Sequence, residues 1–370
     1  MSEYQCYEFV ALDRPLTAKQ MAELRSISTR AEISPTRFWN EYQWGDLKAD
    51  PAKLVQRYFD AHLYFANWGT HRLMLRVPKA RLDGKALKPY VTGGQAARIT
   101  SAGEHVVLDL TSETEEPEYD EQSQGALAAL SPLRAELMRG DLRPAYLAWL
   151  LANQPGDVDD DATEPPVPAG LAELTAAQEA MVEFLRIDVD LVAAAASGSA
   201  ATTDDGEPFR QWVADLSAKE KDRWLRRAAD EPELALGSEL LRAFRATAKA
   251  ERPGARRTVS ELRTLAEAQR AQREQLEVAR AKKERVAEEA ERQRRLTRLS
   301  RDVDAAWRKL EKLVGASGYD EAVELAVALR DLAARDGQSA AFAARFEAMR
   351  KRQLRRRGFF DRWKYAGGVA

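Results

Sequence analysis

Apolar and polar positions alternate in short runs over residues 1–115, as expected of β-strands that bury one face. The segment YQCYEFVAL is one such run, and the segment 59–78, FDAHLYFANWGTHRLMLRVP, contains two more. The two runs in 59–78 are separated by Asn67-Trp68-Gly69-Thr70, in which Asn and Gly favour turn conformations. We therefore predict a β-hairpin over 59–78.

Two short helices are predicted between these strands. The amphipathic segment TAKQMAELRSIS has Thr17 as its N-cap, and Gln20 three residues later completes a capping box. A second helix starts at Asp50-Pro51 and runs to about His62. The segments LKPYVTGGQAARIT and EHVVLDLTSE add a final strand pair. This βαβαββ-like order predicts an α+β fold, an antiparallel-sheet sandwich with helices on one sheet face.

From residue 121 to 255 the periodicity becomes helical and rich in Ala and Leu, which predicts a mostly α-helical region. Two stretches interrupt it. The segment 155–170, PGDVDDDATEPPVPAG, combines acidic residues with proline, and a second loop lies near 196–208. We expect both to be solvated linkers, because they contain too few apolar residues to offset the entropy of ordering.

A long charged helix is predicted over 256–314, since residues 258–314 contain neither proline nor glycine. A heptad register from Leu262 places apolar side chains such as Leu276 and Val286 on one side, but it also places Gln269 and Lys283 there. The seam is therefore weak. A solvated connecting helix, or one half of a loose coiled coil, fits this pattern better than a tight dimer zipper.

Residues 296–370 are predicted to form a three-helix module with a turn at Asp336-Gly337 and a basic, aromatic tail. Its pattern, with Trp307, Tyr319-Asp320-Glu321-Ala322-Val323 and a closing arginine run, resembles the helical tail of some bacterial proteins that carry a SWIM-type zinc finger. The finger itself needs Cys-x-Cys and Cys-x-His pairs, and Cys6 is the one cysteine here. Residues 4–78 are also similar to a family of uncharacterised bacterial proteins. These resemblances imply a bacterial accessory or interaction protein and no particular reaction.

Composition narrows the class of protein only a little. Apolar residues make up 45% and charged residues 31% of the chain, and the formal net charge is -2, which favours globular folding and selects no partner. A single cysteine excludes an internal disulfide framework and fits a reducing compartment, so we expect a cytoplasmic protein. The pattern contains no signal peptide and no membrane span.

The three histidines, His62, His71 and His105, all fall in the α+β region and are weak candidates for a metal centre. His62 falls at the predicted helix end, where an imidazole suits the dipole, and the other two open strands after turns. Capping or surface roles therefore explain the histidines better than a metal or acid–base role. No motif specifies a nucleophile, a phosphate loop or a cofactor, and we expect no cofactor.

Two further groups are candidates for partner binding. Trp44 and Trp68, each followed by glycine, are placed at neighbouring strand ends, where an indole serves either core packing or a partner surface. The tail is the other group. Its arginines suit a polyanion, while its aromatic residues suit either that role or the capping of the helical module; the residues are Arg355, Arg356, Arg357, Phe359, Phe360 and Trp363.

The absence of a converging catalytic set, beside so much extended helix, favours a non-enzymatic bacterial cytoplasmic interaction or scaffold protein. Its partner would be another protein or a second copy of the chain. One alternative is a nucleic-acid-associated accessory protein that uses the basic tail. The other is a metal-dependent enzyme at the three histidines.

Overall fold

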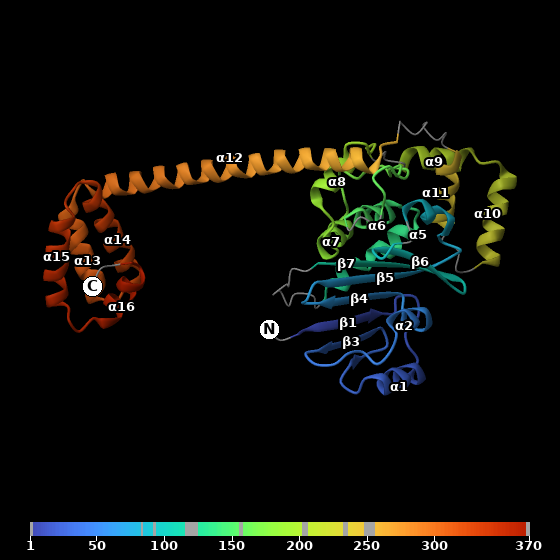
Figure 1. Ribbon diagram of the computed structural model, residues 1–370, viewed down its shortest axis with the longest axis horizontal. Helices are drawn as coiled ribbons and strands as arrows, with labels where there is room; N and C mark the ends of the chain where they lie inside the picture. The colour runs from blue at the N-terminus through green and yellow to red at the C-terminus, as the bar shows by residue number, and fades with distance from the viewer. Residues whose placement is uncertain are drawn as a thin grey trace. The chain divides into compact units, whose positions relative to one another are not determined.

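The computed structural model describes residues 3–82, 84–91, 94–114, 125–154, 158–201, 206–231, 236–247 and 256–367. It divides into two compact units, Met1–Gln272 and Arg273–Ala370 (Figure 1). The predicted α+β class is confirmed, because an antiparallel sheet near the N-terminus is followed by helices.

The first unit is organised around a seven-stranded sheet with the order β2-β3-β1-β4-β5-β7-β6. Every strand pair in it is antiparallel. The strands are β1 Gln5–Val10, β2 Glu32–Ile33, β3 Arg37–Tyr42, β4 Ala61–Ala66, β5 Thr70–Pro78, β6 Ala97–Ala102 and β7 His105–Glu113.

The local signals in the sequence explain where several of these elements begin and end. Thr17 and Gln20 form the predicted capping box of α1 (Ala18–Ile27), and Asp50 caps α2 (Pro51–Arg57) by accepting from the Ala52 amide. The predicted hairpin is formed by β4 and β5. Gly69 turns it with φ +108°, and a Cβ there would lie 2.0 Å from the Thr114 carbonyl oxygen.

The sheet has one apolar face, here named the covered face, which includes Leu63, Leu73, Leu75, Leu108 and Leu110. Several helices of the first unit contribute to the core over this face, together with Leu87, Tyr90 and the first turns of the long helix. Most of the helical contribution comes from α4 Ala126–Leu130, α5 Pro132–Met138, α6 Arg143–Asn153, α7 Ala176–Phe184 and α8 Val189–Ala196. They had been expected to form a region of their own, but they share one core with the strands because the covered face presents apolar side chains to them.

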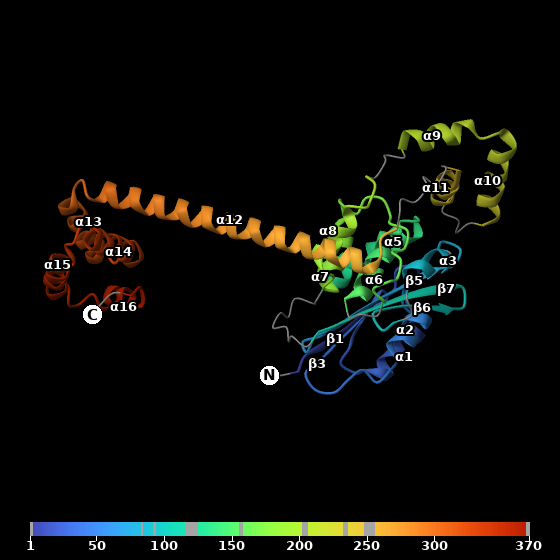
Figure 2. The same ribbon diagram turned by 45° about the horizontal axis from the view of Figure 1, so that its top comes forward.

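The opposite face, here named the groove face, is only partly covered. Helices α1 and α2 close it over Phe9, Phe38 and Met74. In Figure 1 and Figure 2, α1 lies on one side of the strands while α6 and α7 lie on the other. Short helices α3 (Gly84–Leu87) and η1 (Lys88–Tyr90) precede β6.

Three further helices of the first unit bury very little. They are α9 Gly206–Asp215, α10 Ala218–Asp230 and α11 Leu236–Thr247. No residue of α9 or α10 is buried, although both helices are amphipathic. Phe209, Trp212 and Phe244 make ring contacts with one another between α9 and α11.

Part of the expected linker 155–170 is packed rather than solvated. Glu164 is 2% exposed, and both of its carboxylate oxygens accept from Arg257, each at 2.8 Å, just before the long helix α12 (Val259–Leu299) begins. Tyr146 also donates to Glu164. A buried carboxylate needs such partners, and they hold the segment against α6. Residues 155–157, and residues 202–205 of the second expected linker, lie outside the described residues.

The long helix ends at Leu299, before the expected residue 314. Asp302 then caps a separate helix, α13, by accepting from the Ala305 amide at 2.8 Å, which explains the break without proline or glycine. The second unit packs α13 Val303–Gly315, α14 Tyr319–Arg335, α15 Ser339–Arg352 and α16 Arg357–Tyr365. Its core includes Trp307, Leu310, Leu329, Phe346 and Met349.

Among the described residues, none of the helices combines the length and the apolar character that a membrane crossing requires.

Candidate functional site

A groove of about 750 Å³ lies over the groove face, where α1 and α2 leave the sheet uncovered, and extends to Leu151 and Gln154 at the end of α6. Polar side chains dominate its lining, and most come from alternate positions of β1, β4, β5, β6 and β7. Its lining includes Tyr7, His62, Tyr64, Thr70, Arg72, Arg98, Asp109, Thr111 and Glu113. This is the size range of pockets that hold small ligands.

Arg72 and Asp109 form an ion pair in the lining of the groove. The Arg72 Nε lies 2.8 Å and its Nη2 2.7 Å from the two carboxylate oxygens of Asp109, so the pair is bidentate. The hydrogen bond to Asp109 raises the pKa of Arg72. Arg98, on β6, stands directly opposite Asp109 in the β6–β7 register and is exposed. The aspartate therefore lies between arginines of two neighbouring strands.

Tyr7 and Tyr64 form one wall, with ring centroids 4.7 Å apart. Tyr7 donates its hydroxyl to Asp46 at 2.5 Å, and Tyr64 donates to Gln5 Oε1 at 2.9 Å. Burial raises the pKa of Tyr64 to about 12 and raises that of Tyr7 as well. Both phenols therefore stay protonated, and hydrogen bonds fix their rings in place.

His62 forms part of the floor. It was expected at a helix end, but α2 stops at Arg57 and His62 lies inside β4, fully buried, with its ring stacked on Phe9 at 4.0 Å. Its Nδ1 lies 2.9 Å from the Glu8 carbonyl oxygen, so Nδ1 carries the proton and donates. Burial lowers the pKa of His62 to about 3. The neutral ring leaves Nε2 as a buried acceptor, and no described residue donates to it.

The other two histidines do not join His62. His71 lies on the covered face, opposite Phe65, and its Nε2 lies 2.8 Å from Arg186 while its Nδ1 contacts the Phe184 carbonyl oxygen. His105 opens β7 opposite Pro78, at the far end of the strand pair. Among the residues that the structure describes, no group of three or more His, Cys, Asp or Glu side chains is placed to hold a metal ion.

The two tryptophans proposed for partner binding follow strand ends on either side of β1. Trp44 is 78% exposed and follows β3, while Trp68 is 41% exposed in the β4–β5 turn. The starts of β3 and β4 pair with the same end of β1, which places both turns at the other end of the sheet. Neither indole is a core residue.

The aromatic residues and the arginines of the tail differ in how deeply they are buried. Phe359 and Trp363 are 0% and 3% exposed in the core of the second unit, and Phe360 is half-buried. Arg356 donates to the Gly315 carbonyl oxygen at 2.7 Å, whereas Arg355 and Arg357 are exposed. Phe359 and Trp363 thus cap the helices, while Arg355 and Arg357 face solvent.

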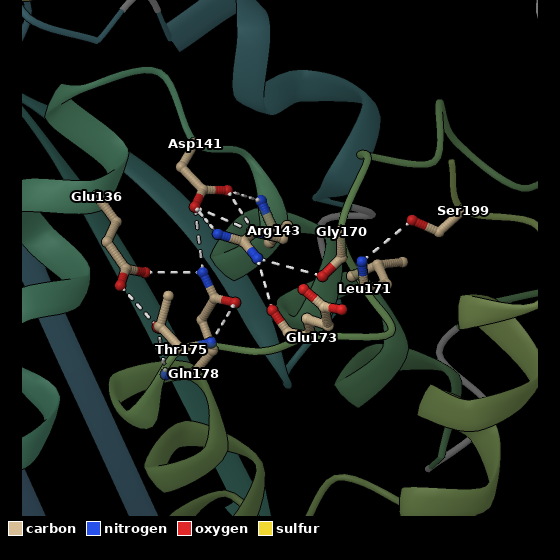
Figure 3. Close-up of polar contacts among 9 residues, drawn as sticks. All are labelled: Glu136, Asp141, Arg143, Gly170, Leu171, Glu173, Thr175, Gln178 and Ser199. Atoms are coloured by element: carbon tan, nitrogen blue, oxygen red, sulfur yellow. Dashed lines mark hydrogen bonds and ion pairs between the residues drawn. The ribbon is translucent and has the colours of Figure 1, made fainter. Parts of the chain in front are cut away.

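A second polar cluster, at the start of α7, is structural (Figure 3). Gln178 donates to Glu136 at 2.8 Å and to Asp141 at 3.2 Å, and Arg143 forms a bidentate pair with Asp141. Burial raises the pKa of Asp141, but the Arg143 hydrogen bonds outweigh burial and the net pKa is lowered. Arg143 also donates to the carbonyls of Gly170 and Glu173. These contacts fasten the irregular segment before α7.

The groove residues Arg72, Arg98 and Asp109 were missed by sequence reasoning. The available signal was a charged residue at alternate positions of three predicted strands, which shows which side chains share a face. The pattern does not show which strands are neighbours, because β7 inserts between β5 and β6.

Comparisons with known proteins do not assign the chain to a family. No family model matches the chain, and neither the curated proteins nor the solved structures contain a significant match.

Proposed function

We propose that this protein is a non-enzymatic interaction protein that associates with a second copy of itself through α12. The observation that carries the proposal is the exposure of that helix. Every residue from 271 to 295 is exposed, and Leu276 and Val286 are 64% and 63% exposed. A helix that serves only as a connection needs no apolar side chains on such a surface.

Both ends of this exposed stretch are anchored. At the start, Leu262 is buried and Arg270 pairs with Asp188 at 2.5 Å. At the end, Leu296 is buried and Arg292 pairs with Asp331 at 2.7 Å. The helical conformation is thus maintained from both ends, so a partner helix would bind it without ordering it first.

The heptad pattern places Leu276, Ala279, Val286 and Ala290 on one side, where Lys283 interrupts the apolar stripe. Charges of both signs alternate around this side, as in the ion pairs Arg273–Glu277 and Arg280–Glu284. Two copies of the helix therefore do not repel each other through surfaces of like charge. The short apolar stripe supports a weak, reversible association.

Sedimentation equilibrium of the full chain over a wide concentration range tests the proposal. We expect reversible dimer formation that the double variant Leu276→Lys, Val286→Lys abolishes. The matched control, Val278→Lys with Ala281→Lys, adds the same charge at outer heptad positions of the same helix and should leave the dimer intact. A wild-type chain that stays monomeric, or equal loss in both double variants, would contradict self-association through this stripe.

The nucleic-acid alternative receives less support. Phe359 and Trp363 are buried, which leaves Tyr365 and the half-buried Phe360 as the described tail rings that a base could contact.

A further inference from the structure

We propose that the groove on the sheet binds a neutral, hydroxyl-rich ligand, a mono- or oligosaccharide. This inference concerns a different surface from α12 and does not depend on the proposed self-association. It rests on the charge, the hydrogen-bonding groups and the rings that line the groove.

The charged residues of the lining balance. Arg72 and Arg98 face Asp109 and Glu113, and Arg72 and Asp109 already neutralise each other through two hydrogen bonds. A site for a phosphate or a polycarboxylate would carry an excess of positive charge. The lining instead offers donors, such as Arg98 and Thr111, beside acceptors, such as Glu113 and His62 Nε2, which suits a ligand whose groups both donate and accept.

His62 specifies part of that ligand. Its Nε2 is a buried acceptor to which no described residue donates. The other ring nitrogen, Nδ1, donates to the Glu8 carbonyl oxygen. A buried acceptor without a donor is costly, so the groove is completed by a molecule that brings an O–H or N–H group. A sugar hydroxyl donates to Nε2 and also accepts from a neighbouring arginine.

The tyrosine wall supplies the apolar contact. The Tyr64 hydroxyl donates to Gln5, so this half-buried side chain offers its ring to the groove, and the buried Tyr7 packs against that ring from inside. A sugar ring has one face made of C–H groups, which packs on an aromatic ring while its hydroxyls reach the polar groups at the edge.

Selective ¹⁵N labelling of histidine tests the site directly, because the chain has three histidines and His62 is the one that lines the groove. The full chain is titrated at pH 7 with glucose, maltose and maltotriose, and separately with inorganic phosphate and citrate. We expect at least one saccharide to shift the Nε2 resonance of His62 saturably and to leave that of His105 unchanged. The two anions should leave His62 unchanged.

Arg98→Gln keeps the exposed strand position but removes a charged donor, and should weaken the saccharide affinity about tenfold. Arg30→Gln removes an exposed arginine elsewhere in the same unit and should leave the affinity unchanged. His62→Phe should abolish saturation-transfer signals from the saccharide, and if that variant does not fold, the Arg98 comparison decides. The proposal is overturned if no saccharide shifts His62, if phosphate or citrate does so, or if Arg98→Gln binds like the wild type.

Discussion

The two faces of the sheet are built from the same strands, yet they carry side chains of different kinds. On the covered face, Leu73 and Leu110 are at most 1% exposed beneath the helices. One residue away along the same strands, Arg72 and Thr111 line an open groove. Strand alternation alone produces two faces, and in many antiparallel sheets the second face is simply solvated.

The groove face differs from a merely solvated face at two points. It holds a bidentate Arg72–Asp109 pair, and it buries His62 with one nitrogen lacking a donor among the described residues. His71, on the covered face, has both ring nitrogens in contact with protein groups. Folding explains the histidine that is fully bonded, whereas the other is better explained by a molecule that the groove receives.

The largest expected effect compares two tryptophans. Trp149, on α6 over the covered face, is 2% exposed, and Trp149→Ala should lower the free energy of unfolding by about 3–5 kcal/mol. Trp68, in the β4–β5 turn, is 41% exposed, and the same change there should cost less than about 1 kcal/mol. Urea unfolding of both variants measures the difference, and similar losses would show that the turn is part of the core.

The next effect concerns the ion pair in the groove. Arg72→Leu leaves Asp109, which is 9% exposed, without its guanidinium and should destabilise the fold by about 1–3 kcal/mol. The double variant Arg72→Leu, Asp109→Leu removes the unpaired carboxylate and should recover most of that loss. Urea unfolding of both variants checks the pattern. A double variant that is no more stable than Arg72→Leu would show that the pair contributes stability beyond mutual neutralisation.

The strands, the hairpin and the caps were predictable because each depends on neighbours in sequence. Thr17 and Gln20 lie three residues apart, and the Gly69 turn joins strands that follow each other directly. The end of α12 was missed, since an aspartate at position 302 resembles any other charged residue of that run until the backbone turns there. Local signals therefore predict which helices and strands form better than they predict the residues at which these elements end.

The candidate site was largely unpredictable for a different reason. His62 was placed at a helix end because the apolar run continues through Tyr58 and Phe59, where helix and strand patterns look alike. Glu164 was taken as part of a solvated acidic run, although Arg257, 93 residues later, buries it. Such contacts depend on which distant segments meet, and one sequence does not contain that information.

A smaller effect is expected from pH. Because burial lowers the pKa of His62 from 6.5 to about 3, the unfolded chain binds a proton that the folded chain does not. The contribution of His62 to stability is therefore complete above pH 6.5 and is lost as the pH falls toward 3. Between pH 6.5 and 5.5 the wild type should lose about 1 kcal/mol more than His62→Phe. Urea unfolding at the two pH values measures this, and parallel losses would mean that the pKa of His62 is not lowered in the folded state.

The smallest effect on stability is expected at Arg98, and it separates a solvated face from a binding face. Arg98 is exposed on β6, so Arg98→Gln should change the free energy of unfolding by no more than about 0.5 kcal/mol, as measured by urea unfolding. If the groove face were only solvated, Arg98→Gln would change neither the free energy of unfolding nor the response of His62 to saccharides. A variant that unfolds like the wild type but no longer responds to a saccharide at His62 would instead show that the charge serves binding, because packing would be unchanged. A stability loss comparable to that of Arg72→Leu would place Arg98 in the structural ion pair and remove it from the ligand-binding set.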